Sequence, residues 1–209
     1  SYSTQAITVN EQPSEPIVLQ GHGDTATNTF ILDEGVAIFH MTHSGDSNFQ
    51  IWLYDGQGNM VDLLVNVIGS YSGSKIVGVT GGYVDASPGP HLLDVTADGN
   101  WQVTIEQPKT FIPLELPHTF TGEGDTVTGP FMLESGIARF EMSHDGDSNF
   151  QIWLYDSDGE MIELLVNEIG DYSGSKIVGV TGGLLDASPG IHLLEVTADG
   201  DWTITITHQ

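Results

Sequence analysis

The sequence repeats itself over most of its length, and this repeat limits the possible folds more than any other feature. When the chain is shifted by 101 residues, positions 21–106 align with positions 122–207 without a gap, and about two-thirds of the paired residues are identical. A solenoid unit has roughly 20–50 residues, so each of these longer copies is expected to form a complete domain. The predicted organisation is an N-terminal extension (1–15), a first domain (16–107), a Pro-rich linker (108–120) and a second domain (121–209).

Alternating hydrophobic residues within each copy predict β-strands. In Val36–His43 and Ile137–His144 every second position keeps its residue (Ala, Phe, Met and His in turn), whereas positions between them change, as in the replacement of Ile38 by Arg139. A period of two with one constant apolar face is typical of a strand that is buried on one side. Turn signals such as Asp98–Gly99 separate these runs, and no segment has a convincing helical period. The fold is therefore predicted to be all-β, with two tandem jelly-roll-like β-sandwiches.

The charge balance limits the partners of the chain. There are 29 acidic residues and only four lysines and arginines, which gives a formal net charge of −25 and an isoelectric point near 4.1. Such a surface repels phosphate backbones and anionic lipid, so neither nucleic acid nor a membrane surface is an expected partner. No apolar run reaches the roughly 18–20 residues of a membrane-spanning helix. The acidity fits either adaptation to high salt or a surface that attracts cations such as Ca²⁺.

The sequence contains none of the common enzyme motifs. It has no cysteine, which excludes a thiol nucleophile, a thiolate metal site and a disulfide framework. The patterns H-E-x-x-H, G-x-S-x-G and G-x-x-x-x-G-K-[ST] are also absent. Acidic residues are spread over the whole chain, so no pair stands out as a general acid and base. We therefore expect a protein without catalytic activity, for which Ca²⁺ is the one cofactor to consider.

Each copy contains the same ordered set of longer motifs. The pattern F-x-L-x-x-G-x-A-x-F-x-M-x-H-x-G-D-S-N-F-Q-I-W-L-Y-D-x-x-G is followed by P-G-x-H-L-L-x-V-T-A-D-G-x-W. This order resembles that of the jelly-roll β-sandwich modules of the pre-peptidase C-terminal type, which are appended to secreted bacterial and archaeal proteins. The resemblance covers most of both copies, although Ser47–Phe49 stands where that family often has an Asp-x-Asp pair. It implies a secreted or cell-surface module without catalytic activity.

An aromatic stripe in each copy is a candidate interface or ligand surface. The segment G-D-S-N-F-Q-I-W-L-Y-D is unchanged between the copies. If its Phe, Ile and Leu residues point inward, then Trp52 and Tyr54 lie on the outer face in the first copy, as do Trp153 and Tyr155 in the second. Exposed rings of this kind can stack on a glycan or form a protein interface. Alternatively, a loop or the neighbouring domain covers them.

Polar residues around this stripe are candidate calcium ligands. His43, Asp46 and Asn48 lie close together before the stripe, and oxygen ligands from a loop suit Ca²⁺, whereas a single histidine is a poor start for a Zn²⁺ site. The same residue types can instead cap turns by binding their own backbone. The candidate calcium ligands are Asp24, Asp46, Asn48, Asp85, Asp125, Asp147, Asn149 and Asp186.

Two of the four basic residues occupy the same position of a segment that occurs twice, Y-S-G-S-K-I-V-G-V-T-G-G. These residues are Lys75 and Lys176. In such an acidic chain each ammonium group is expected to pair with a carboxylate, either across a sheet or between subunits. Alternatively, the aliphatic stem packs while the charged head reaches solvent, or the lysine forms an isopeptide bond with Asn66 or Asn167.

The N-terminal extension resembles a strand of the repeat. The segment Ala6–Pro13, with Ile7 and Val9, is similar to Gln102–Pro108, although each domain already has such a strand at its own C-terminal end. The surplus strand either packs on the first domain or joins a sheet edge of a second copy, as donor strands do. The second arrangement grows into an open filament. We therefore predict a secreted or cell-surface structural protein that self-assembles, and the alternative is a glycan-binding or adhesion module.

Overall fold

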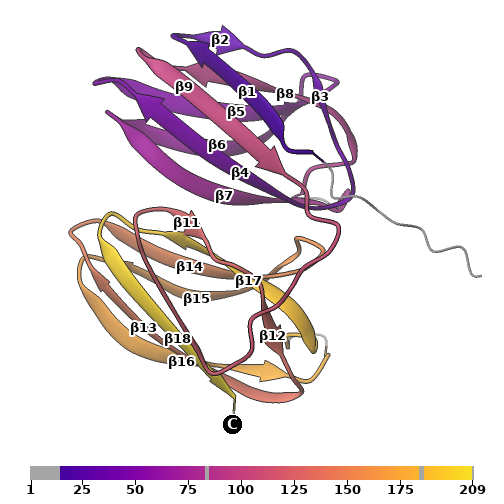
Figure 1. Ribbon diagram of the computed structural model, residues 1–209, viewed down its shortest axis with the longest axis vertical. Coiled ribbons are helices and arrows are strands. Elements are labelled where there is room, and N and C mark those ends of the chain that lie inside the picture. The colour runs from indigo at the N-terminus through magenta and orange to yellow at the C-terminus, as the bar shows by residue number, and fades with distance from the viewer. Residues whose placement is uncertain (1–14, 83–84, 184–185, 209) are drawn as a thin grey trace, which may run out of the picture.

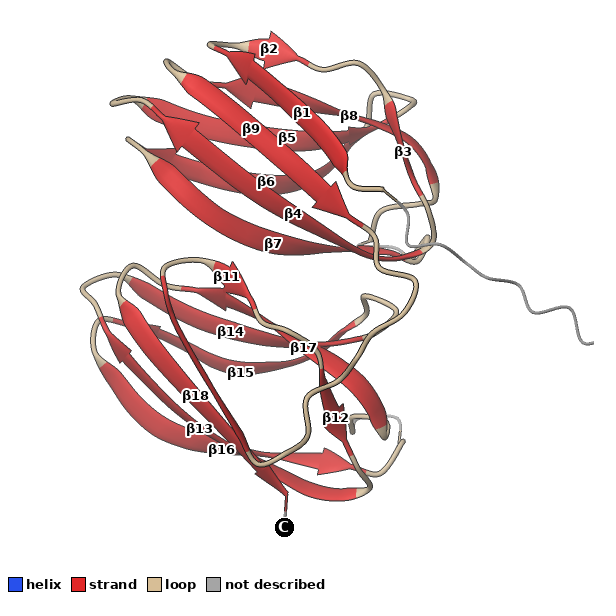
Figure 2. Ribbon diagram, in the orientation of Figure 1, coloured by secondary structure: helices blue, strands red, loops and turns tan. Residues whose placement is uncertain are grey.

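The described secondary structure of the protein is all β-strand, arranged in two domains of the same topology (Figures 1 and 2). The computed structural model describes residues 15–82, 85–183 and 186–208. Ile7 and Val9 lie outside these ranges, and so does the surplus strand that they were expected to form. The prediction of an all-β chain with two tandem sandwiches is confirmed.

The first domain is a sandwich of two facing sheets. Its strands are β1 (Ile17–His22), β2 (Thr25–Ala26), β3 (Phe30–Leu32), β4 (Gly35–Ser44), β5 (Asn48–Asp55), β6 (Met60–Ile68), β7 (Tyr71–Val79), β8 (Gly89–Thr96) and β9 (Asn100–Glu106). One sheet has the order β1-β9-β4-β7 and the other has the order β2-β8-β5-β6, with β3 also paired to β8. These two orders are those of a jelly roll.

The second domain repeats this arrangement. Its strands are β10 (His118–Glu123), β11 (Thr126–Val127), β12 (Phe131–Leu133), β13 (Gly136–Asp145), β14 (Asn149–Asp156), β15 (Met161–Ile169), β16 (Tyr172–Val180), β17 (Gly190–Thr197) and β18 (Asp201–His208). The sheet orders are β10-β18-β13-β16 and β11-β17-β14-β15, with β12 also paired to β17. The predicted linker, 108–120, was too long at its C-terminal end, because residues 118–120 pair with β18 and belong to the sandwich.

Each sandwich encloses its own hydrophobic core, as the alternation of apolar residues predicted. Phe49, Ile51 and Leu53 of β5 are completely buried. Trp101 closes one end of the first core and donates its indole N–H to the carbonyl oxygen of Gly23 at 3.1 Å. Gly21 lies against the same indole ring, and any side chain there would overlap it. The recurring glycine and tryptophan are therefore one packing unit.

The two lysines of the repeated segment join the sheets of each sandwich. Lys75 on β7 lies 2.8 Å from Asp62 on β6, and it also donates to the carbonyl oxygen of Leu63 at 2.9 Å. Because β6 and β7 are edge strands of opposite sheets, this ion pair links the two sheets along one edge of the sandwich. Lys176 and Glu163 form the same ion pair in the second domain, also at 2.8 Å. The structure thus contains the expected pairing with a carboxylate across the sheets.

Candidate interaction site

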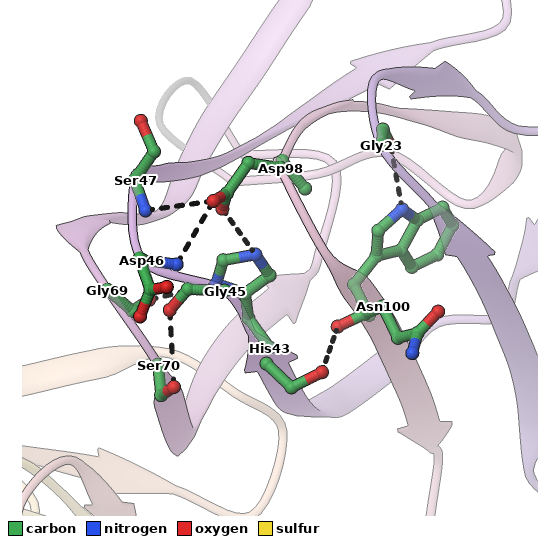
Figure 3. Close-up of polar contacts among 12 residues, drawn as sticks. Gly23, His43, Gly45, Asp46, Ser47, Gly69, Ser70, Asp98 and Asn100 are labelled. Atoms are coloured by element: carbon green, nitrogen blue, oxygen red, sulfur yellow. Dashed lines mark hydrogen bonds and ion pairs between the residues drawn. The ribbon is translucent and has the colours of Figure 1, made fainter.

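The polar residues near the start of β5 form a clamp between three turns (Figure 3). Asp98, in the turn between β8 and β9, accepts hydrogen bonds from the backbone N–H groups of Asp46 and Ser47 at 3.0 and 3.1 Å. Its other carboxylate oxygen lies 3.3 Å from Nε2 of His43, whose side chain is fully buried. Nδ1 of His43 lies 2.8 Å from the carbonyl oxygen of Gly69. The clamp therefore holds the β4–β5, β6–β7 and β8–β9 turns together.

The central carboxylate of this clamp was missed in the sequence, where Asp98–Gly99 indicated only a turn. The N–H groups of Asp46 and Ser47, with the nearby His43 ring, hold the pKa of the Asp98 carboxyl below its usual range. The sequence does contain one indication of this role, because Asp98 recurs as Asp199 in the other copy. The second domain has the same clamp, made by His144, Asp147 and Asp199.

The candidate calcium ligands serve mainly as local caps. Asp24 and Asp125 accept hydrogen bonds from the backbone N–H groups of Ala97 and Ala198, both at 3.0 Å. Asp85 and Asp186 accept hydrogen bonds from threonine hydroxyls five residues earlier, and Asn48 and Asn149 are the first residues of β5 and β14. Asp46 and Asp147 contribute their backbone N–H groups to the clamps. Within the described ranges, no three His, Asp or Glu side chains are grouped so that they could hold a metal ion.

The two domains meet in a third hydrophobic cluster, which belongs to neither sandwich core. Val36 and Ile38 on β4 and Ile76 on β7 pack from the first domain against Tyr155 on β14 and Leu193 on β17 of the second. These five side chains are each less than 10% exposed: 2%, 9%, 2%, 4% and 1%. Phe111 of the linker, Val127 and Trp153 pack around them. The outer face of one sandwich is thus buried by the other domain.

Hydrogen bonds surround this cluster. The Tyr71 hydroxyl donates to Asp125 at 2.9 Å, and the backbone N–H of Ile76 donates to the Glu195 carboxylate at 2.6 Å. The Ser74 hydroxyl accepts a hydrogen bond from the N–H of Val127 at 2.8 Å. Because apolar burial and directional hydrogen bonds act together here, the relative orientation of the two domains is defined.

Buried acidic groups make this contact sensitive to protonation. Burial raises the pKa of Glu195 to about 7, although the N–H of Ile76 and the Lys75 ammonium group favour its ionised form. The nearby carboxylates of Asp62 and Asp125 raise this pKa further. Burial also raises the pKa of Asp125, against the hydrogen bonds from Tyr71 and Ala198. Near neutral pH the Glu195 side chain is therefore partly protonated.

The interface joins unlike faces of the two similar domains. The first domain contributes the outer face of β4 and β7, which we call the isoleucine face. The second domain contributes the outer face of β14 and β17, which we call the aromatic face. Because the domains repeat, each face has a second copy that the intramolecular contact leaves unused. In Figure 1, β7 lies next to the second domain, whereas its counterpart β16 lies on the side of the second domain away from the first.

The aromatic stripe consequently has a different environment in each domain. Tyr155 is buried and Trp153 packs at the interdomain cluster while staying partly exposed, so the neighbouring domain covers part of this copy. Trp52 and Tyr54 remain partly exposed on the first domain. The two copies therefore differ at the tyrosine, which is buried in the second domain alone, whereas Trp52 and Trp153 are both partly exposed.

Comparisons with known proteins give distant structural likenesses. No protein-family model and no curated sequence matches the chain. The chain is similar to the PBSX exported protein XepA, with 8% identity, a TM-score of 0.31, and coverage of 93% of this chain and 87% of that one. It is also similar to the tandem CBM22-1-CBM22-2 domains of Paenibacillus barcinonensis Xyn10C, with 10% identity, a TM-score of 0.26, and coverage of 94% and 92%. A secreted protein of Parabacteroides distasonis, itself described as putative, gives 10% identity, a TM-score of 0.24, and coverage of 93% and 89%.

These values are too low for any function to be transferred. The β-sandwich fold implied by the resemblance to pre-peptidase C-terminal modules is present, but no comparison shows membership of that family. In the portion of the chain that is described, no helix could cross a membrane.

Proposed function

We propose that the chain is a non-catalytic structural module of a secreted or cell-surface protein, and that its molecules associate end to end. The observation that carries this proposal is the joining of unlike faces at the interdomain contact. A contact between unlike faces of similar units leaves one face of each kind free at the ends, so it extends unless it closes into a ring. The resemblance to modules of secreted proteins supports the extracellular location.

The character of the interdomain contact supports a structural role. Tyr71 and Ile76 of the first domain bind Asp125 and Glu195 of the second, and a small shared hydrophobic cluster lies between them. Two domains held in this way form a stiff unit of the kind that extended assemblies are built from. Strand donation by residues 1–13 remains a separate prediction, which concerns a segment outside the described residues.

Self-association is tested by sedimentation velocity over a range of protein and salt concentrations. We expect the sedimentation coefficient to rise with protein concentration. The rise should be larger at high salt, because salt screens the repulsion between molecules that each carry a net charge of −25. Electron micrographs of the concentrated samples should show linear particles. If the protein remains a 22.5 kDa monomer under every condition, the proposal is wrong.

A second candidate function, glycan binding, is favoured by the partly exposed rings of Trp52 and Tyr54. Flat aromatic rings on an open sheet face can stack on sugar rings. Tryptophan fluorescence titrated with oligosaccharides tests this alternative, with Trp52→Ala as the variant and Trp153→Ala as its matched control. A saturable response that Trp52→Ala alone removes supports glycan binding, whereas the structural function predicts no saturable response.

A further inference from the structure

We infer that the isoleucine face of the second domain binds the aromatic face of the first domain of another copy, in the register of the interdomain contact. This inference rests on the proposed end-to-end association and identifies the two surfaces that make it. Each residue of the interdomain contact has a counterpart 101 positions away in the other domain, and these counterparts form the two free faces.

The free copy of the isoleucine face exposes the side chains that its counterpart buries. Ile76 is 2% exposed in the first domain, whereas Ile177 is 61% exposed in the second. Val36 is 2% exposed, whereas its counterpart Ile137 is 44% exposed. The second domain therefore presents two large apolar side chains at the place where the first domain has its internal partner.

The free copy of the aromatic face shows the complementary difference. Leu193 is completely buried in the interdomain contact, whereas its counterpart Leu92 on β8 is partly exposed beside Trp52 and Tyr54. Glu195 is buried, whereas its counterpart Asp94 is exposed. The first domain thus retains the leucine and the aromatic rings that cover the isoleucine face inside the molecule.

The tyrosine, aspartate and serine groups of the contact are also kept in the free faces, whereas the shorter Asp94 takes the place of Glu195. Tyr172 takes the place of Tyr71 and Asp24 takes the place of Asp125. Asp24 binds the backbone N–H of Ala97 through Oδ1, and Asp125 binds its own alanine through Oδ1 as well, while its Oδ2 accepts from Tyr71. In a second copy placed in the same register, Oδ2 of Asp24 is therefore the acceptor for the Tyr172 hydroxyl.

Ser175 completes this polar set. Its counterpart Ser74 is buried and accepts the hydrogen bond from Val127, whereas Ser175 is exposed. Ala26 takes the place of Val127 on the partner face, and a backbone N–H serves equally well with either side chain. The intermolecular contact thus keeps this hydrogen bond, from the N–H of Ala26 to the Ser175 hydroxyl.

The main substitution in the free isoleucine face suits an aromatic and acidic partner. Arg139 replaces Ile38, and its Nη2 lies 3.0 Å from Glu141, while among the described residues its buried Nε has no hydrogen-bond partner. In the register of the interdomain contact, Arg139 faces the side that carries Tyr54 and Asp94. A guanidinium group is attracted to aromatic rings and to carboxylates, so the replacement favours this partner face.

Two exposed isoleucines provide a matched test in sedimentation experiments. Ile177 is on the free isoleucine face, whereas Ile169, which is 81% exposed, is at the end of β15 and outside it. We expect Ile177→Glu to raise the dissociation constant of self-association by at least roughly tenfold, because it buries a charge in an apolar contact. Ile169→Glu should leave the constant unchanged. A thermal melt of each variant confirms that it is folded.

Cysteine crosslinking tests the register, since the native chain has no cysteine. A mixture of Ala26→Cys and Ser175→Cys proteins should form a disulfide-linked heterodimer under oxidation, and the double variant should form a ladder of multimers. Ala26→Cys mixed with Ile169→Cys serves as the control and should stay uncrosslinked. If the native protein associates, but the two glutamate variants behave alike and no heterodimer forms, this inference is wrong and the proposed function stands. If the native protein never associates, both are wrong.

Discussion

Tyr71 of the first domain donates a hydrogen bond to Asp125 of the second domain, with 2.9 Å between the phenol and carboxylate oxygens. Burial and the nearby carboxylates of Asp125 and Glu195 raise the pKa of Tyr71, so its hydroxyl stays protonated as the donor. The counterparts of this pair lie in different domains, Tyr172 at the start of β16 in the second and Asp24 between β1 and β2 in the first. The repeat therefore supplies a matched control for each interdomain residue.

Removal of the Tyr71 hydroxyl should destabilise the protein. Tyr71→Phe leaves the partly buried Asp125 carboxylate without this donor, which is expected to cost about 1–3 kcal/mol. Urea unfolding of dilute protein measures the loss. Tyr172→Phe is the control and should change the free energy of unfolding by less than roughly 0.5 kcal/mol. Equal losses in the two variants would mean that the interdomain hydrogen bond does not contribute.

Glu195 should make the stability fall as the pH rises. Its folded pKa of about 7 lies above the ordinary value of 4.5. As the pH rises, the unfolded chain therefore releases this proton at a lower pH than the folded protein does. Ionisation of Glu195 favours unfolding between those two pH values. The full effect above pH 7 is about 3 kcal/mol. We expect Glu195→Gln to be more stable than the native protein above pH 7 and to lack this part of the pH dependence.

The control for Glu195 is its exposed counterpart Asp94. Asp94→Asn should change the free energy of unfolding of dilute protein by less than roughly 0.5 kcal/mol, since the side chain is exposed there. Denaturant unfolding at a series of pH values measures both variants. A Glu195→Gln profile that matches the native one at every pH would contradict the buried-carboxylate explanation.

The ionised Asp98 carboxylate should stabilise the folded protein at neutral pH. Its depressed folded pKa means that its contribution is present above the ordinary value of 3.8 and is lost as the pH falls through the folded pKa. We expect Asp98→Asn to lower the melting temperature at neutral pH. On acidification, the melting temperature of this variant should fall less than that of the native protein. Asp46→Asn is the control, because Asp46 contributes its backbone N–H to the clamp. A larger effect at Asp46 than at Asp98 would indicate a ligand role for the Asp46 side chain.

Calcium should have little effect on the folded chain. The candidate ligands are spread over separate caps and clamps, and no described group of three His, Asp or Glu side chains could hold a metal ion. An ion that binds only the folded state must raise its stability. We therefore expect the same melting temperature with excess Ca²⁺ and with a chelator, at matched ionic strength. A clear increase with Ca²⁺ alone would contradict this expectation and support a calcium site.

The sequence was sufficient to predict the sandwiches because their cores depend on local alternation. The period-two pattern of Phe49, Ile51 and Leu53 identifies their inward face without knowledge of any neighbour. The same logic was wrong for Ile38. Its replacement by Arg139 indicated a solvent-facing position, yet Ile38 is buried by the second domain. A contact between domains has no local period, so only the arrangement in space reveals it.

The two aromatic stripes show the same limit more directly. Trp52 and Tyr54 lie in the same sequence segment as Trp153 and Tyr155, but Tyr155 is buried against the first domain whereas Tyr54 is partly exposed. No property of the shared segment distinguishes them. The difference comes from the arrangement in space, because the first domain packs against the stripe of the second domain and the second domain does not pack against that of the first.

The contact between unlike faces also has a geometric consequence. The rotation and shift that carry the first domain onto the second form a screw operation, and the interdomain contact fixes it. If the same operation is repeated from molecule to molecule, every domain along a linear assembly occupies an equivalent position, whether its contact with the preceding domain lies within one molecule or between two. The handedness and pitch of such an assembly are then already determined by the contact within a single molecule.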